Sequence, residues 1–333
     1  MNINNFYEIL KSEPSYRLKQ AQQLLFGDLI SDWSQASNLP LALREKLNQE
    51  CPLAIKSKVL TAHDKKSFKA LITLEDGAKI ETVLMRHKEG RDTICLSSQV
   101  GCPLGCTFCA TGASGFEKSL NKNEILEQAI FWARYLKTNF KAKITNVVFM
   151  GMGEPFLNYD QVMSAIRTLN DVDGLHIGAR HISISTSGLV DGIKRLAKEK
   201  LQINLAISLH SANDKIRTDL MPVNKKNPLV QLLRAVDYYI EKTNRQVMFE
   251  YMLMKGINDS NEAAERLAVI MDKPLYVVNL INYNETSVFK PVNEKIFKNF
   301  EKILQKRKIK VTSRYRFGSD IEAACGQLAA RSK

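Results

Sequence analysis

Short apolar runs alternate with amphipathic segments along most of the chain after about residue 91. The runs, which are rich in β-branched residues, are 93–98, 144–150, 181–186, 202–208, 246–253 and 275–281. Between them lie stretches with apolar residues at helical spacing, such as 122–137, 160–170, 228–242 and 260–271. This alternation predicts an α/β fold in which a parallel sheet is joined by crossover helices.

The first 90 residues have a different pattern. Residues 15–50 indicate two or three short helices, and residues 67–86 predict a strand hairpin that turns at Asp76-Gly77. We therefore expect a small accessory module at 1–90, an α/β unit at 91–315 and a C-terminal segment at 316–333.

Polar or sulfur-bearing residues follow five of the six predicted strands. They occupy the loop 102–109 and the segments 151–155, 185–188, 208–210 and 282–284. The carboxyl ends of parallel strands meet at one edge of the sheet, where binding sites form. Ordinary turns explain any one of these segments, since Gly and Ser are common in turns, but they explain all five together less well.

The composition is that of a globular protein, with 44% apolar and 25% charged residues in a chain of 333. No apolar stretch reaches the roughly 18 residues of a membrane-spanning helix. The first residues lack the basic start and apolar core of a secretory signal. We expect a soluble, cytoplasmic protein without membrane contact, in which clustered cysteines indicate metal binding rather than disulfides.

Positive charge is concentrated near the end of the chain. Of the formal net charge of +13, residues 290–333 carry 12 basic and 4 acidic side chains, or +8. A solvated helix face is one interpretation, but the run continues beyond the predicted helix and is interleaved with Tyr315 and Phe317. We therefore favour RNA as the partner. The basic residues between positions 302 and 319 are Lys302, Lys306, Arg307, Lys308, Lys310, Arg314 and Arg316.

Three of the six cysteines form a Cys-x3-Cys-x2-Cys arrangement at Cys102, Cys106 and Cys109. A Cys-x2-Cys pair alone is compatible with zinc or with a dithiol redox pair. A closed zinc site needs a fourth ligand, and no second Cys pair or His pair follows nearby. Three thiolates on a [4Fe–4S] cluster leave one iron open, and S-adenosylmethionine (SAM) can chelate that iron through its amino and carboxylate groups.

The chain resembles the RlmN/Cfr family of radical SAM enzymes, which methylate adenine in RNA. The likeness runs from residue 81 to residue 328, with weaker similarity at 16–47. The cysteine motif by itself is typical of the whole superfamily, whereas Cys95 and the Ala-Ala-Cys-Gly-Gln-Leu ending are specific to this family. The motifs are Cys95-Leu-Ser-Ser-Gln-Val-Gly-Cys102, Phe149-Met-Gly-Met-Gly-Glu-Pro155, Ser183-Ile-Ser-Thr-Ser-Gly188, Ile207-Ser-Leu-His210 and Asp320-Ile-Glu-Ala-Ala-Cys-Gly-Gln-Leu328.

The resemblance implies an incomplete (β/α)6 barrel with a small N-terminal RNA-contacting module. It implies a [4Fe–4S] cluster on Cys102, Cys106 and Cys109, with SAM as the second cofactor. The SAM pocket would be lined by Gly153, Glu154, Ser185, Ser208, Leu209, His210 and Asn284. The implied partners are 23S rRNA and tRNA, with a flavodoxin-like electron donor for a monomeric enzyme.

The family mechanism implies three catalytic residues. Adenine C2 is electron-poor and cannot attack a sulfonium methyl group. Instead Cys325 accepts a methyl group, which a 5′-deoxyadenosyl radical activates so that it adds to C2. Glu81 then accepts the C2 proton, and Cys95 attacks the Cys325 sulfur, releasing methylated RNA and leaving a disulfide.

Other interpretations remain for these residues. Buried cysteine is often a small hydrophobe, which could account for Cys95 and Cys325, and Cys51 is expected to be structural. Modification of adenine C8 is a second possibility. Three features depart from the C2-modifying pattern: the segment 317–320, the Glu81-to-Cys95 spacing and Asn282-Tyr283. Pro155 and the segment 185–188 agree with that pattern. A non-catalytic RNA-binding protein that holds zinc is a third.

Overall fold

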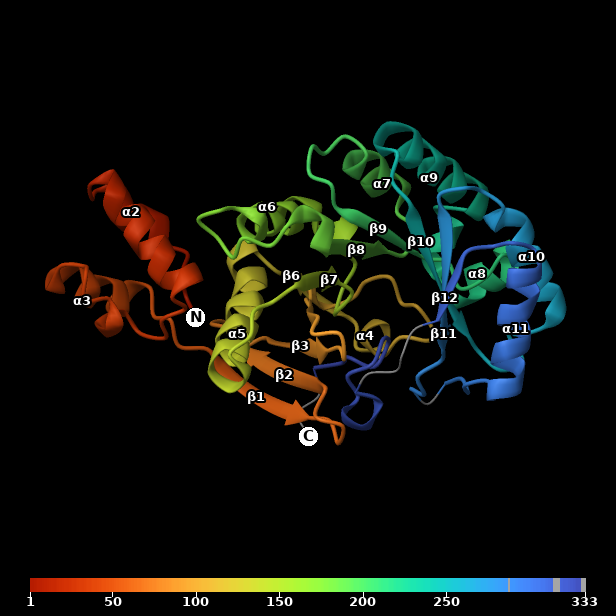
Figure 1. Ribbon diagram of the computed structural model, residues 1–333, viewed down its shortest axis with the longest axis horizontal. Helices are drawn as coiled ribbons and strands as arrows, with labels where there is room; N and C mark the ends of the chain where they lie inside the picture. Colours follow the sequence, from red (N-terminus) through yellow and green to blue (C-terminus); the bar gives the residue numbers. More distant parts are fainter. Residues whose placement is uncertain (287, 314–317, 331–333) are drawn as a thin grey trace.

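A computed structural model describes residues 1–286, 288–313 and 318–330, and its main feature is one ten-stranded mixed sheet (Figure 1). The strand order is β1-β2-β3-β4-β7-β8-β9-β10-β11-β12. The strands are β1 (Lys56–Thr61), β2 (Ser67–Thr73), β3 (Lys79–Arg86), β4 (Asp92–Cys95), β7 (Asn146–Phe149), β8 (Ile182–Thr186), β9 (Asn204–Ser208), β10 (Val247–Leu253), β11 (Tyr276–Asn282) and β12 (Val311–Ser313).

In the main sheet, β4 and β7–β12 are all parallel, which confirms the α/β class. The six predicted strands are β4 and β7–β11, and β12 is a short seventh strand that the apolar pattern did not predict. Among the described residues, the edge strands β1 and β12 do not pair with each other. The sheet is therefore open, as in an incomplete barrel. Strands such as β10 are buried over almost their whole length because helices and loops cover both faces of the sheet.

Eleven α-helices lie within the described residues, and several run between consecutive parallel strands. Helix α5 begins with a capping box in which Asn121 and Glu124 exchange hydrogen bonds with each other's backbone, and it ends at Lys141 in the left-handed conformation. The helices are α1 (Phe6–Lys11), α2 (Ser15–Gln22), α3 (Leu41–Glu50), α4 (Ala110–Ala113), α5 (Lys122–Phe140), α6 (Tyr159–Asn170), α7 (Val190–Leu196), α8 (Asp214–Leu220), α9 (Leu229–Thr243), α10 (Asn261–Met271) and α11 (Glu294–Lys306). None of the described helices is long and apolar enough to cross a membrane.

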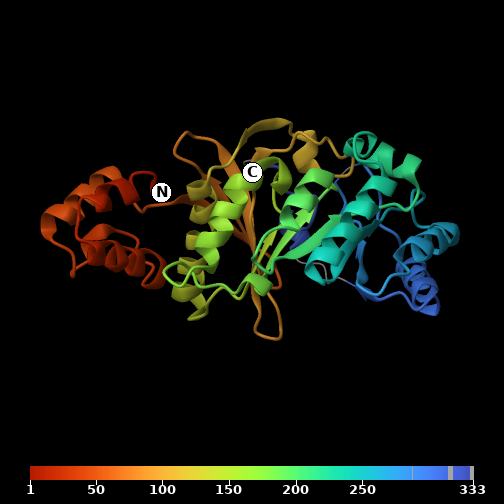
Figure 2. The ribbon, with the colours of Figure 1, turned by 90° about the horizontal axis from the view of Figure 1, so that it is seen from above.

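The N-terminal helices form a core of their own at one end of an elongated molecule, opposite α10 and α11 (Figures 1 and 2). Phe6 stacks on Trp33, and the Trp33 indole N–H donates to the backbone oxygen of Cys51 at 2.8 Å. Cys51 is fully buried in this core, as expected of a structural cysteine. Arg134 of α5 attaches the helices to the rest of the protein by donating to the backbone oxygen of Leu53 at 2.8 Å.

The predicted hairpin is present as β2 and β3, but it belongs to the main sheet. Strand β3 pairs with β4 in antiparallel fashion from Val83↔Cys95 to Arg86↔Asp92. Hairpin residues such as Phe68, Ile72 and Leu84 share the main hydrophobic core with the parallel strands. The sheet therefore runs without interruption across residue 90, and the division of the chain at that point remains a prediction.

Candidate active site

The three motif cysteines lie in a loop closed by a small two-stranded ladder. Strands β5 (Gln99–Gly101) and β6 (Phe116–Ser119) pair on either side of the loop, and the Cys102 N–H donates to the Gly115 oxygen at 2.8 Å. Gly101 has a φ of +75°, and a Cβ there would lie 2.0 Å from the Gly115 oxygen. Glycine is therefore required for the loop to close.

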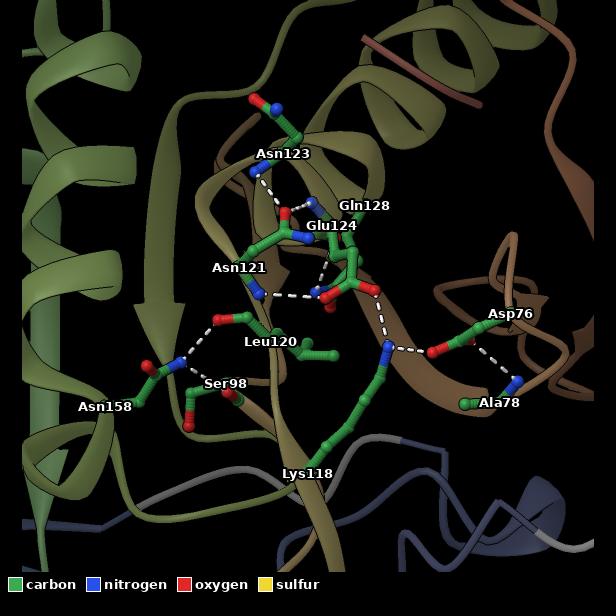
Figure 3. A network of polar contacts seen from close by, with 10 residues as sticks. All are labelled: Asp76, Ala78, Ser98, Lys118, Leu120, Asn121, Asn123, Glu124, Gln128 and Asn158. Carbon is green, nitrogen blue, oxygen red and sulfur yellow. Dashed lines mark hydrogen bonds and ion pairs between the residues drawn. The ribbon is translucent and has the colours of Figure 1, made fainter. Parts of the chain in front are cut away.

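Figure 3 shows how this ladder is anchored to the surrounding elements. The Lys118 ammonium on β6 donates to Glu124 at the start of α5, at 2.6 Å, and to Asp76 in the turn between β2 and β3. On the other side, the amide of Asn158 donates to the backbone oxygens of Ser98 and Leu120 at 2.8 and 2.7 Å. The strand before the cysteine loop and the chain after it are thus fixed to the barrel.

Cys102, Cys106 and Cys109 line one cavity at the carboxyl ends of the parallel strands. Burial raises the pKa of the Cys102 thiol to about 11, and it also raises the pKa of Cys106. Thiols this basic lose their protons when a metal binds them. The same cavity is lined by five of the seven predicted SAM residues, namely Gly153, Glu154, Ser185, Ser208 and His210.

The Glu154 carboxylate is held by the backbone beside it. It accepts hydrogen bonds from the Phe156 and Ser187 N–H groups at 3.1 and 2.8 Å, and burial raises its pKa against their effect. The Glu154 N–H donates to the Gln99 side-chain oxygen at 2.9 Å. A buried carboxylate with an adjacent cavity suits the ammonium group of an amino acid moiety.

Gly153 permits a close approach that no other residue allows. Its φ is +97°, and a Cβ at this position would lie 2.5 Å from the Cβ of Gln99. Gln99, which is 1% exposed, therefore packs against Gly153 and also accepts from Glu154. The sequence pattern did not single out Gln99, because an isolated Gln beside a strand resembles a surface residue.

His210 is buried in the cavity wall with a φ of +55°. Its Nδ1 accepts a hydrogen bond from the Met252 N–H at 3.2 Å, and its ring meets Phe108 edge-on at 4.8 Å between centroids. Burial, aided by the charge of Arg217, lowers the pKa of His210 to about 3. The ring is therefore neutral, and with Nδ1 accepting, Nε2 carries the proton.

Arg217 on α8 was missed at the sequence level. Its side chain is 0% exposed and donates to the backbone oxygens of Ser187 at 2.7 Å and Ser208 at 3.1 Å. It thus joins the ends of two parallel strands beside the cavity. A lone arginine in a short polar helix has no sequence signal that distinguishes it from a surface residue.

The remaining two predicted SAM residues lie elsewhere. Leu209 is 0% exposed, belongs to the main core and donates its N–H to the Glu250 oxygen at 3.0 Å. Asn284 lines a second cavity, where its amide donates to the Cys325 backbone oxygen at 3.2 Å. The Asn284 side-chain oxygen is buried and has no hydrogen-bond partner within the described part of the chain, so it could accept a hydrogen bond from a ligand.

Cys95 and Cys325 are far apart in sequence but line this second cavity together, along with Cys109. Cys325 also lines the first cavity, so it lies where the two meet. Cys95 is 8% exposed at the end of β4, and none of the six cysteines, all within the described residues, forms a disulfide. The structure therefore brings the two predicted catalytic thiols to one place beside the cysteine loop.

Glu81 is not brought to these cavities. Its carboxylate lies 2.9 Å from the Lys69 ammonium and accepts from the Ala329 and Ala330 N–H groups at 2.8 and 3.2 Å. Its role as the proton acceptor remains a prediction.

The three thiols that line the first cavity fit an iron–sulfur cluster. Among the described residues, no group of three or more His, Cys, Asp or Glu side chains is arranged to hold a single metal ion. A zinc site requires four ligands on one ion. In a [4Fe–4S] cluster each thiolate binds a different iron, so three thiols that line one cavity fit this group.

Two basic side chains of the run contact other parts of the protein at its surface. Arg307 forms an ion pair with Glu265 at 2.8 Å, and the Lys310 ammonium donates to the Pro274 oxygen at 3.1 Å. Lys302, Lys306 and Lys308 are exposed. Arg314, Tyr315, Arg316 and Phe317 lie outside the described residues, so RNA binding by this run remains a prediction.

Comparison with known proteins identifies the class. The profile of the radical SAM superfamily matches residues 96–268, about half of the chain, so the protein belongs to that superfamily. Enzymes of this class use a [4Fe–4S] cluster and SAM, and these are the cofactors of this chain.

Full-length relatives define the family more narrowly. The chain is 44% identical to the probable dual-specificity RNA methyltransferase RlmN of Dictyoglomus thermophilum, over 99% of this chain and 95% of that one. It is 44% identical to the protein of the same description from Carboxydothermus hydrogenoformans, over 96% and 93%. A radical SAM methyltransferase from Sphaerobacter thermophilus superposes with a TM-score of 0.94 at 40% identity, covering 99% of this chain and 98% of the other. The chain belongs to the RlmN family of radical SAM methyltransferases.

Proposed function

We propose that the protein methylates C2 of adenine in 23S rRNA and in tRNA, through a methylated cysteine and a transient disulfide. The observation that carries the proposal is the shared cavity of Cys95 and Cys325 next to Cys109. The names of the relatives, which describe dual-specificity RNA methyltransferases, support RNA as the substrate.

The residues around the first cavity would hold the cofactors. Cys102, Cys106 and Cys109 would bind the cluster, and Glu154 would bind the ammonium group of SAM. When bound, these groups supply the methyl group and the one-electron chemistry that attaches it to the base. An external, flavodoxin-like donor would supply the electrons.

Cys325 would act as the methyl acceptor. Its sulfur would take the methyl group that SAM supplies, and the thiol proton would pass to solvent. Because Cys325 lines both cavities, it can reach the cofactor side and the Cys95 side from one position. A sulfur nucleophile at this place explains how a carbon that cannot attack a sulfonium group still receives a methyl group.

Cys95 would release the product. Its thiolate attacks the Cys325 sulfur, an S–S bond forms and the bond from that sulfur to the RNA-bound carbon breaks. The electron pair of the broken bond goes to that carbon, which takes a proton and becomes a methyl group. The disulfide is then reduced by an external thiol before another turnover. Glu81 would take the C2 proton once its carboxylate is released from Ala329 and Ala330.

Nucleoside analysis tests the proposal. The anaerobically reconstituted, brown protein is incubated with SAM, a reductant and either rRNA or tRNA, and the RNA is digested to nucleosides. We expect 2-methyladenosine from both RNAs. Only 8-methyladenosine would favour the C8 alternative, to which the Glu81-to-Cys95 spacing points. A colourless protein with one zinc and no product would favour the non-catalytic alternative.

A further inference from the structure

The segment that carries Cys325 is held on both sides of the cysteine by elements far away in the sequence. Before Cys325, the Asp320 carboxylate accepts from the His63 backbone N–H at 2.8 Å. The backbone oxygen of Glu322 accepts from the Lys69 ammonium at 3.2 Å. After Cys325, the Glu81 carboxylate accepts from the Ala329 N–H at 2.8 Å. The hairpin therefore contacts the segment at two places that flank the cysteine.

The loop that follows Cys109 holds the same segment from the other side. The Ala110 N–H donates to the Gly326 oxygen at 2.8 Å. The Thr111 hydroxyl, which is buried, donates to the Leu328 oxygen at 2.5 Å. The residues next to Cys325 are thus fixed directly to the start of α4, and the distance between Cys325 and the cysteine loop depends on these contacts.

Lys69 links the two hairpin contacts. Its side chain is 7% exposed. Its ammonium lies 2.9 Å from Glu81 Oε1 and 3.2 Å from the backbone oxygen of Glu322. The other oxygen of Glu81 accepts from Ala329 and Ala330. One ammonium group therefore contacts the segment before Cys325 and also orients the carboxylate that holds the segment after it.

We propose that Lys69 is a positioning residue that docks the Cys325 segment between the hairpin and the cysteine loop, and so places Cys325 where it accepts the methyl group. The proposal rests on the proposed function for the role of Cys325, but the docking itself is a property of the contacts. Lys69 touches neither the cofactor cavity nor the cavity shared by Cys95 and Cys325. Its action is through the segment.

The first test measures docking in the anaerobic holoenzyme without RNA. Hydrogen exchange of residues 318–330 and alkylation of Cys325 by iodoacetamide are followed by mass spectrometry, with buried Cys51 as the internal reference. In Lys69→Met we expect both rates to rise about tenfold, because the charged hydrogen bond to Glu322 is lost and Glu81, which holds Ala329, loses the ion pair that orients it. Lys69→Arg should restore most of the protection. Lys56→Met, at an exposed position of β1, should behave as the wild type.

Removal of one partner of a buried ion pair can prevent folding. The double variant Lys69→Met/Glu81→Met removes both charges and should fold, yet it lacks both hairpin contacts to the segment. It should show the same rise in exchange at 318–330. Wild-type protection in either Lys69→Met or the double variant would overturn the proposal.

The second test measures the consequence for Cys325. The proteins are incubated with SAM without RNA, and S-methylation of Cys325 is quantified by mass spectrometry together with the iron content. We expect Lys69→Met to methylate Cys325 about tenfold more slowly with the cluster intact. Equal rates in wild type and Lys69→Met would overturn the positioning role. If the wild type itself left Cys325 unmethylated, the proposed function would fail, whereas the exchange data would still decide whether Lys69 docks the segment.

Discussion

His210 shows how the position of one residue fixes its protonation state. The ring is buried, accepts a backbone N–H at Nδ1 and lies near the positive charge of Arg217. All three conditions disfavour the imidazolium form. The cavity therefore contains a neutral donor at Nε2 over the whole physiological pH range.

This state makes the stability of the protein depend on pH. The pKa of His210 is about 3 in the folded protein, below its usual value of 6.5. Unfolding therefore takes up a proton below about pH 6.5, so the free energy of unfolding falls as pH drops, by at most about 1.4 kcal/mol per pH unit. His210→Asn keeps a residue that tolerates positive φ and should remove this contribution between about pH 5 and 6.5 in urea denaturation. His63→Gln, at an exposed position, should keep the wild-type slope; equal slopes in wild type and His210→Asn would contradict the assignment.

Substitution of Cys325 and substitution of Cys95 should stop the reaction at different steps. Cys325→Ala should abolish methyl transfer with the iron and sulfide content unchanged, because the acceptor sulfur is lost. Cys95→Ala should accumulate a covalent RNA–protein adduct, visible as a slow band in denaturing gels, because the product cannot be released. Cys51→Ala, in the separate N-terminal core, should retain turnover. Normal turnover by Cys95→Ala would show that Cys95 does not release the product.

Among the elements, strand ends and loops are joined by buried polar side chains. Asn158, at the start of α6, holds the chain on both sides of the cysteine loop through Ser98 and Leu120. Gln99 follows Ser98 directly and accepts from Glu154. Glu154, whose carboxylate we expect to bind SAM, is thus positioned by Gln99, and Gln99 in turn follows the segment that the Asn158 amide holds.

Asn158→Ala should therefore affect both stability and cofactor binding. The Leu120 oxygen loses this donor, whereas the Ser98 oxygen keeps the Leu120 N–H at 3.1 Å. At about 1–3 kcal/mol for one unsatisfied buried group, we expect a loss of about 1–3 kcal/mol in the free energy of unfolding. Urea denaturation measures this loss, and equilibrium binding of SAM should show a weaker affinity. Asn139→Ala, in the exposed last turn of α5, should change stability by less than about 0.5 kcal/mol. Similar losses in the two variants would contradict the role of Asn158.

Over the whole molecule, the antiparallel hairpin and the parallel strands form one folding unit. Strand β3 covers the edge of β4, and hairpin residues fill the main core. The N-terminal helices, in contrast, have a separate core. We therefore expect a folding boundary before β1 in addition to the predicted division at residue 90, which remains a prediction.

Two fragments test this boundary. Residues 55–333 should fold with cooperative thermal unfolding, because the sheet and its core stay complete. Residues 91–333 should aggregate or unfold, since the edge of β4 and the apolar residues under the hairpin become exposed. Circular dichroism and size-exclusion chromatography distinguish the outcomes. A monomeric, cooperatively folded 91–333 fragment would support the division at residue 90.

Local sequence patterns were sufficient to predict the parallel strands and the residues at their ends. Strand–helix alternation predicted six of the seven parallel strands, and the order of strand ends predicted that Glu154, Ser185, Ser208 and His210 would lie around the cysteine loop. These predictions succeed because helix and strand periods are local and because parallel strands must end at one edge. The three-residue strand β12 is too short to give such a period.

Contacts between residues far apart in the sequence became visible only in the folded protein. Cys325 and Cys95 line one cavity although they are far apart in the sequence. Arg217 is buried between two strand ends, and Lys69 contacts both Glu81 and Glu322. No shared periodicity connects the segments that meet in these contacts. The same holds for Glu81, which lies against the C-terminal segment instead of either cavity. A buried ion pair or a shared cavity depends on how separate elements pack. The residues of one element alone do not determine the energy of that packing.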